Sequence, residues 1–208
     1  MKKIAVLSLI LLMGCSQEAP VKVPPAIEIT PMDLTDREIK ILQGFSGDEV
    51  LAYDLKVTNL QEKIIQVTIE HYHNGKKEED PLDFGSEILN AEQETSVLIS
   101  RTRIQENDEI GSYQTKAVLI DQTGYSSFQS APVNYDEPFD SSIFNKLEES
   151  KKVNLDDEVV IGVTVEGDGS QGLSGGTLDE NEPEFKTMIQ QNKDVFVYKI
   201  KIVSNWKK

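Results

Sequence analysis

Two histidines separated by one residue are the side chains of this sequence with the clearest capacity for chemistry. His71 and His73 end a segment of alternating apolar residues, which is typical of a β-strand. Residues i and i+2 of a strand point to the same face, so the two imidazoles are expected to lie together. A carboxylate from Glu78, Glu79 or Asp80 could complete a zinc or copper site. Because both histidines also continue the apolar face, we favour a structural role over a metal-binding one.

Residues 167–176 contain two glycine patterns that occur in enzymes. Residues 167–172 match G-x-G-x-x-G, which binds dinucleotides when a helix begins directly after it, but here residues 173–176 continue the loop. Residues 172–176 match the G-x-S-x-G of hydrolases, in which a histidine base follows the serine in the chain. Both histidines of this chain precede the serine. The sequence therefore predicts no catalytic residue and no cofactor, and a protein that is not an enzyme.

Three further features could contact ligands, and each has a simpler interpretation. Arg101 and Arg103 could bind an anion, but charged residues also protect solvated edge strands from aggregation, and we favour that role. Trp206, the single tryptophan, could anchor a partner, but we expect it to pack over the end of the fold. Acidic residues 156–158 could bind calcium, but no EF-hand loop accompanies them, so we favour a solvated turn.

Short β-strands are the elements predicted to position these residues. Alternating apolar residues predict strands over 50–58, 64–73, 95–104 and 112–121, with weaker strands over 27–30, 36–42 and 125–133. Turn-forming residues such as Asn74-Gly75 separate them. This spacing predicts a mainly β fold, an antiparallel immunoglobulin-like β-sandwich over residues 26–135, without the Cys…Trp…Cys pattern of immunoglobulin domains.

Residues 136–208 predict a smaller α+β region, or further strands of the same sandwich with helical crossovers. Apolar residues spaced by four predict a short helix that includes Phe139, Ile143 and Leu147. Alternating apolar residues predict a single strand face made of Val159, Ile161, Val163 and Val165. A second helix is predicted to begin near residues 179–182, with Pro183 in its first turn, and a final strand is predicted over residues 196–202.

The first fifteen residues resemble a bacterial lipoprotein signal peptide. Lys2 and Lys3 precede an apolar run, and Leu12-Met13-Gly14-Cys15 is similar to a lipobox. The apolar run of about ten residues is too short to span a membrane stably. The resemblance implies that residues 1–14 are removed, that Cys15 carries a lipid, and that the protein is anchored on the extracytoplasmic face of the cell membrane. Residues 15–25 then form the lipidated cysteine and a proline-containing tether.

The charge of the chain argues against nucleic acid as a partner. The net charge is −15, and removal of residues 1–14 would take away two lysines and no acidic residue, which gives −17. Phosphate groups would be repelled by such a surface. With the single cysteine assigned to the lipid, no disulfide is expected, so the fold must depend on its apolar core.

Together these features predict a membrane-anchored, extracytoplasmic lipoprotein that acts as a binding or interaction module of the cell envelope. Its contacts are expected in the loops Gly44–Asp48, Asn74–Gly85 and Gly167–Asp179. Two alternatives remain: a metal-binding envelope protein that uses His71 and His73, and a structural or inhibitory lipoprotein that occupies an envelope partner. The expected partners are the membrane, through the lipid on Cys15, and a protein of the envelope.

Overall fold

A computed structural model describes most of the chain beyond the predicted tether. The described residues are 26–46, 49–60, 62–88, 92–106, 109–134, 141–167 and 177–204. Cys15, the tether, the glycine patterns of residues 168–176 and Trp206 lie outside them, so the predictions for these features stay predictions.

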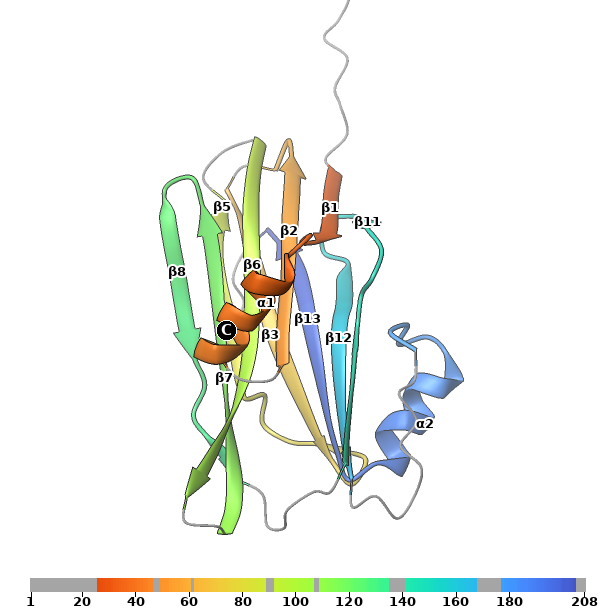
Figure 1. The fold of residues 1–208 in the computed structure, drawn as a ribbon. Helices are drawn as coiled ribbons and strands as arrows, with labels where there is room; N and C mark the ends of the chain where they lie inside the picture. The colour runs from red at the N-terminus through yellow and green to blue at the C-terminus, as the bar shows by residue number, and fades with distance from the viewer. Residues whose placement is uncertain are drawn as a thin grey trace, which may run out of the picture.

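Within the described residues, two antiparallel sheets pack face to face, and the predicted mainly β, sandwich-like architecture is confirmed (Figure 1). The first sheet has the strand order β11 (Lys151–Val153), β1 (Ala26–Pro31), β2 (Glu49–Thr58), β6 (Glu92–Glu106), β7 (Glu109–Asp121) and β8 (Gly124–Gln129), and β9 (Val133–Asn134) also pairs with β7. The second has the order β10 (Ser141–Lys146), β12 (Glu158–Gly167), β13 (Asp194–Val203), β3 (Lys63–His73) and β4 (Lys76–Lys77), and β5 (Leu82–Ile88) also pairs with β3. The described helices are α1 (Asp36–Ser46) and α2 (Pro183–Gln191).

Both sheets contain strands from before and after residue 135. In the second sheet β13 pairs with β3 from Asp194↔His73 to Val203↔Ile64. In the first sheet β11 pairs with β1. Parts of the chain that differ in their sequence pattern therefore contribute to the same two layers.

The apolar core lies between the inner faces of the two sheets. Leu55 of β2, Val67 and Ile69 of β3 and Tyr198 of β13 are all buried there. Full burial of an aliphatic side chain of this size contributes about 1.5–3 kcal/mol. The strands predicted over residues 50–58, 64–73, 95–104 and 112–121 are all present, because strict alternation matches a sheet with one buried face.

The weak strand predicted over residues 36–42 is wrong, because this segment forms α1. Thr35 and Glu38 make a capping box: the Thr35 backbone N–H donates to Glu38 Oε2 at 2.8 Å, and the Glu38 N–H donates to Thr35 Oγ1 at 3.4 Å. These reciprocal bonds satisfy two amides at the helix start. The Thr-x-x-Glu pattern therefore outweighs the short alternation of residues 37–41, and α1 lies across the outer face of the first sheet (Figure 1).

The short helix predicted from the spacing of Phe139, Ile143 and Leu147 is also wrong. Phe139 lies outside the described residues, and Ile143 belongs to β10, an edge strand that pairs with β12 from Ser141↔Gly167 to Lys146↔Gly162. Leu147 extends this pairing, since its N–H donates to the Ile161 carbonyl at 2.9 Å. The open edge of β12 therefore decides the conformation of this segment, against its local periodicity.

An irregularity in β12 corrects the predicted strand face. The register with β13 shifts between Val160 and Gly162, so one extra residue enters β12 there. After the shift, Val163 and Val165 pack on the outer face with α2, whereas Ile161 belongs to the inner core. Gly162 faces inward, since a Cβ built on it would lie 3.0 Å from both terminal carbons of Leu51. A bulge reverses alternation in this way, and a sequence pattern does not show it.

The outer face of the second sheet is covered by α2, and its start near residue 183 confirms the second predicted helix. Phe185 and Met188 of α2 pack on Val195 and Val197 of β13, which forms a smaller apolar cluster separate from the main core. No helix in the described part of the chain has the length and apolar character needed to cross a membrane.

Candidate functional site

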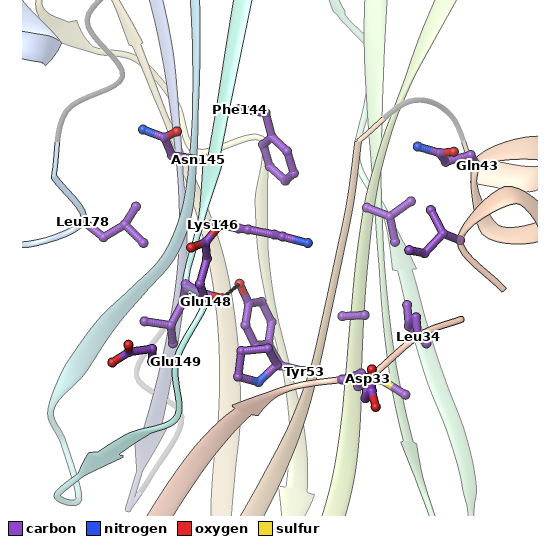
Figure 2. Close-up of a pocket in the computed structure, with 16 residues that line it drawn as sticks. Asp33, Leu34, Gln43, Tyr53, Phe144, Asn145, Lys146, Glu148, Glu149 and Leu178 are labelled. Carbon is purple, nitrogen blue, oxygen red and sulfur yellow. Dashed lines mark hydrogen bonds between the residues drawn. The ribbon is translucent and has the colours of Figure 1, made fainter. Parts of the chain in front are cut away.

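A groove of about 900 Å³ opens at one edge of the sandwich, between the chain that leaves β1 and the strand β10 (Figure 2). Leu34, just before α1, and Ile39 of α1 line one wall. Phe144 of β10 and Leu178 line the other, and Tyr53 of β2 lies between them. The groove therefore combines apolar and aromatic surface with access from solvent, as ligand-binding sites commonly do.

Tyr53 holds the two sides of this groove at a fixed spacing. Its hydroxyl donates to the Ile161 carbonyl at 2.7 Å and lies 3.1 Å from the Leu147 carbonyl, and its ring is buried. Burial is the main reason that the pKa of Tyr53 is raised well above its ordinary value. The phenol therefore acts as a neutral structural bridge between the two sheets, and no proton transfer is expected from it.

Charged side chains surround the groove and make it acidic. Asp33 lies beside α1, and Glu148 and Glu149 follow β10 on the opposite side (Figure 2). Lys146 of β10 is the cation that lines the same groove within the described residues. Three carboxylates against one ammonium group favour a cationic ligand by local charge complementarity.

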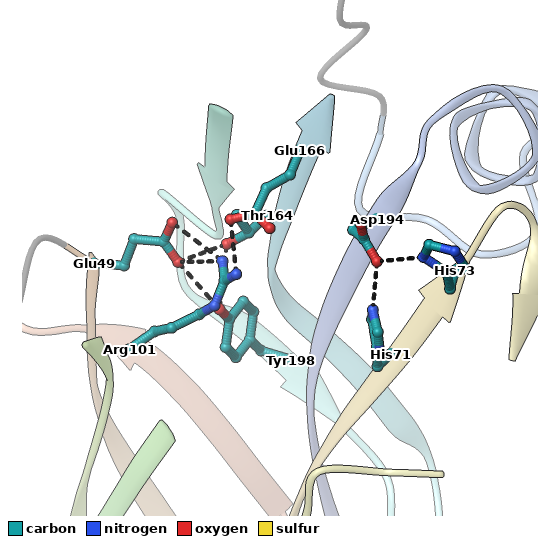
Figure 3. Close-up of polar contacts among 8 residues, drawn as sticks. All are labelled: Glu49, His71, His73, Arg101, Thr164, Glu166, Asp194 and Tyr198. Atoms are coloured by element: carbon teal, nitrogen blue, oxygen red, sulfur yellow. Dashed lines mark hydrogen bonds and ion pairs between the residues drawn. The ribbon is translucent and has the colours of Figure 1, made fainter. Parts of the chain in front are cut away.

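A second polar group of residues lies between the two sheets (Figure 3). The pairing of β1, β2 and β6 places it at the end of the sandwich farthest from Ala26. Arg101 of β6 donates through Nη2 to Glu166 Oε1 of β12 at 2.7 Å, and its Nη1 lies 3.4 Å from Glu49 Oε2. Glu49 also accepts from the hydroxyls of Thr164 at 2.8 Å and Tyr198 at 3.2 Å. These charges are paired, which is the condition under which a buried ion pair is tolerated.

This arrangement corrects the interpretation of Arg101 as a residue of a solvated edge. Its strand β6 lies between β2 and β7, and the Arg101 side chain is only 1% exposed. Its guanidinium carbon lies 3.8 Å from the ring centroid of Tyr113 and 4.0 Å from that of Phe196. Arg103, two residues on, is exposed. Arg101 follows Val97 and Ile99 at intervals of two residues, and this alternation is the sequence signal that Arg101 faces inward with them.

His71 and His73 do lie together, as their spacing predicts, and the carboxylate between them is Asp194 (Figure 3). His71 Nε2 lies 2.8 Å and His73 Nδ1 lies 2.9 Å from Asp194 Oδ1, so each nitrogen donates to the same oxygen. Burial by itself raises the Asp194 pKa, but the two histidine hydrogen bonds outweigh burial and hold that pKa below its ordinary value. The Asn74 amide donates to His73 Nε2 at 2.8 Å, which assigns the His73 proton to Nδ1.

This geometry supports the structural interpretation of the two histidines. The facing ring nitrogens are occupied by one carboxylate oxygen, and His71 also stacks on Phe196 with ring centroids 4.4 Å apart. Across the residues that the structure describes, no group of three or more His, Cys, Asp or Glu side chains is arranged to hold a metal ion. Asp194 alternates in step with the inward-facing, even-numbered residues of 196–202. This alternation in the sequence could have identified Asp194 as the partner of the two histidines.

A third polar group joins the turn that precedes α2 to the outer face of the second sheet. Lys199 of β13 is buried, and its Nζ lies 2.6 Å from Glu180, 2.9 Å from Glu70 and 2.9 Å from Glu158. Burial alone would lower the Lys199 pKa, but the three carboxylates raise it well above the ordinary value. Glu158, considered above as a calcium ligand, is thus a partner of Lys199.

The groove was not predicted from the sequence. None of residues 74–85 lines it, and of the described residues in Gly44–Asp48 and Gly167–Asp179 only Leu178 does. Its walls combine residues 31–53 with residues 144–149, which are distant in the sequence. No local pattern marks such a pairing.

The described residues define a mainly β, sandwich-like protein with a groove at one sheet edge. A family model described as the YgaN domain matches residues 28–202, and the chain belongs to that family. The match includes all described strands from β2 to β12 and both helices. Comparison with curated proteins and with solved structures gave no significant match.

Proposed function

We propose that this protein is a lipid-anchored, extracytoplasmic binding module of the cell envelope, which holds a protein partner in the groove between α1 and β10. The observation that carries the proposal is the groove itself, with its volume of about 900 Å³, its apolar walls and its acidic rim. An enzymatic role has no comparable support, since the buried polar groups described above pair with one another. An immunoglobulin-like display of contacts from a rigid sandwich is part of this proposal, and the two antiparallel sheets support it.

The anchor is proposed from the resemblance of residues 1–15 to a lipoprotein signal peptide. Two acyl chains on Cys15 are enough for stable attachment, whereas one is marginal. A tether of ten residues with prolines could extend roughly 30 Å, at about 3.1 Å per residue. The chain enters the first sheet at Ala26, so the paired charges around Arg101 would lie at the end of the sandwich away from the membrane.

The test is site-specific photocrosslinking in cells from inside and outside the groove. A photoreactive residue at Gln43, an exposed residue that lines the groove, should capture one envelope protein reproducibly. The same residue at Lys186, on the exposed side of α2, is the matched control and should capture none. The adduct should disappear in a Cys15→Ala chain, which cannot be lipidated. Equal capture at both positions, or capture that is independent of Cys15, would contradict the proposal.

A further inference from the structure

The groove is bounded by a strand edge that no described strand occupies. β10 pairs with β12 alone and is an edge of its sheet. The Leu147 N–H donates to Ile161, so residues of odd number in this segment direct their backbone groups toward β12. The N–H and C=O groups of Phe144 and Lys146 therefore point away from β12, and both residues line the groove.

The opposite side of the groove also presents a strand edge. β1 pairs with β2 only as far as Pro31↔Tyr53, and the Met32 N–H then donates to the Ala52 carbonyl at 3.0 Å. The chain next turns away into α1, so Val50 has no strand beside it on that side in the described structure. Backbone hydrogen-bonding groups therefore face the groove from β10 and border it at β2.

The side chains around these edges indicate what kind of strand would fit. Phe144, Leu34 and Ile39 offer apolar contact at the walls, and Asp33, Glu148 and Glu149 offer negative charge at the rim. An extended peptide presents alternate side chains to opposite sides, so one with alternating apolar and basic residues could use both surfaces. The six residues of β10 correspond to a strand of about 20 Å.

We infer that the groove binds an extended, cationic segment of the partner protein, which adds as a strand to the open edge of β10. This inference rests on the proposed binding function and names the chemistry of its partner. Strand addition gives affinity through main-chain hydrogen bonds and specificity through the alternate side chains. A second copy of this chain is a poorer occupant, because a net charge of −15 makes two copies repel each other.

The first arm of the test uses synthetic peptides and the full-length Cys15→Ala chain. The probe is a pool of eight-residue peptides in which Lys or Arg alternates with Val, Leu or Phe, and binding is measured by fluorescence anisotropy. Members of the pool should bind, and counterparts with Glu in place of the basic residues should not. Methylation of alternate backbone nitrogens keeps the side chains but removes the donors, and should weaken binding about tenfold or more.

The second arm changes the protein. Lys146→Pro removes an N–H that points away from β12, a position where an edge strand tolerates proline, and it should weaken peptide binding about tenfold. Lys146→Ala is its matched control and should bind at least as well as the native chain, because it removes the cation among the acids. Glu148→Gln with Glu149→Gln should lower affinity several-fold and reduce its salt dependence. Circular dichroism establishes that each variant is folded.

The outcomes separate this inference from the function on which it rests. Binding that is insensitive to N-methylation and to Lys146→Pro would overturn strand addition. No binding of any peptide in the pool would overturn the cationic-strand inference, and the Gln43 crosslink would still stand for the binding function. Concentration-dependent dimerisation that Lys146→Pro abolishes would overturn it in favour of a second copy of this chain. If the photoreactive residue at Gln43 captured no partner in cells, the proposed binding function itself would be wrong.

Discussion

The guanidinium carbon of Arg101 lies 4.0 Å from the ring centroid of Phe196, and this contact joins β6 of one sheet to β13 of the other. The same ring stacks on His71, which donates to Asp194. Aromatic and charged groups are therefore coupled across the sandwich at the end opposite Ala26. Pairing of this kind fixes the relative position of two sheets more narrowly than apolar packing alone, because hydrogen bonds and stacked rings have preferred directions.

Replacement of Arg101 by Met should destabilise the protein strongly. Glu166 would lose its buried cation, and loss of one partner from a buried ion pair costs about 3–5 kcal/mol. Arg101→Lys retains the charge but not the planar fork, so a smaller loss is expected. Urea unfolding measures both. The control is Arg103→Met, at an exposed position of the same strand, which should change the unfolding free energy by no more than about 0.5 kcal/mol. Similar losses for both arginines would contradict the assigned roles.

Asp194→Asn should reduce stability near neutral pH and have less effect in acid. Because the Asp194 pKa is lowered in the folded protein, its contribution is present above the unfolded value, about 4, and is lost as pH falls through the folded value. Loss of the charge-assisted bonds to His71 and His73 should cost roughly 2 kcal/mol at pH 6. Chemical denaturation between about pH 6 and pH 2 measures the difference between the two chains. A difference that stays constant over this range would refute the assigned role of the carboxylate.

Lys199→Met should loosen α2 from the sheet. Three carboxylates would lose their shared cation, and repulsion among Glu70, Glu158 and Glu180 would push the turn that leads into α2 away from the sheet. We expect a loss of about 2–3 kcal/mol, since Glu158 and Glu180 are partly screened by solvent. Hydrogen exchange of residues 183–191 should accelerate more than exchange in β3. Lys186→Met, on the exposed side of α2, should leave exchange unchanged, and an equal acceleration in that control would count against this prediction.

Gly162→Ala should destabilise the sandwich, whereas Gly44→Ala should stabilise it. A Cβ at Gly162 would lie 3.0 Å from both terminal carbons of Leu51 and 3.3 Å from the Asn145 carbonyl oxygen, so overpacking should cost about 1–3 kcal/mol. Gly44 lies in α1 with nothing within 4 Å of its Cβ position, and alanine there should gain about 0.5–1 kcal/mol through higher helix propensity. Thermal unfolding of the two variants gives the signs. Stabilisation by both would show that the bulge at Gly162 is not tightly packed.

The sequence alone determined which segments are strands wherever alternation is long. The strands β2, β3, β6, β7 and β13 all follow their predicted ranges, because a sheet with one buried face requires alternating side chains. The two segments whose type of secondary structure was predicted incorrectly, residues 36–42 and the segment around Ile143, are short and have weak periodicity. Local capping by Thr35 and Glu38 decided the first, and pairing with β12 decided the second.

The sites depended on tertiary structure to different degrees. The spacing of His71 and His73 predicted that their rings lie together, because both belong to one strand. The residues of the predicted anchor, Leu12 to Cys15, are contiguous, so the sequence alone was enough to propose it. The partner of the histidines, Asp194, is 121 residues or more away, and the groove joins residues 31–53 to residues 144–149. Such contacts are created when two sheets pack, so they depend on the register and on the bulge at Gly162, which no local pattern encodes.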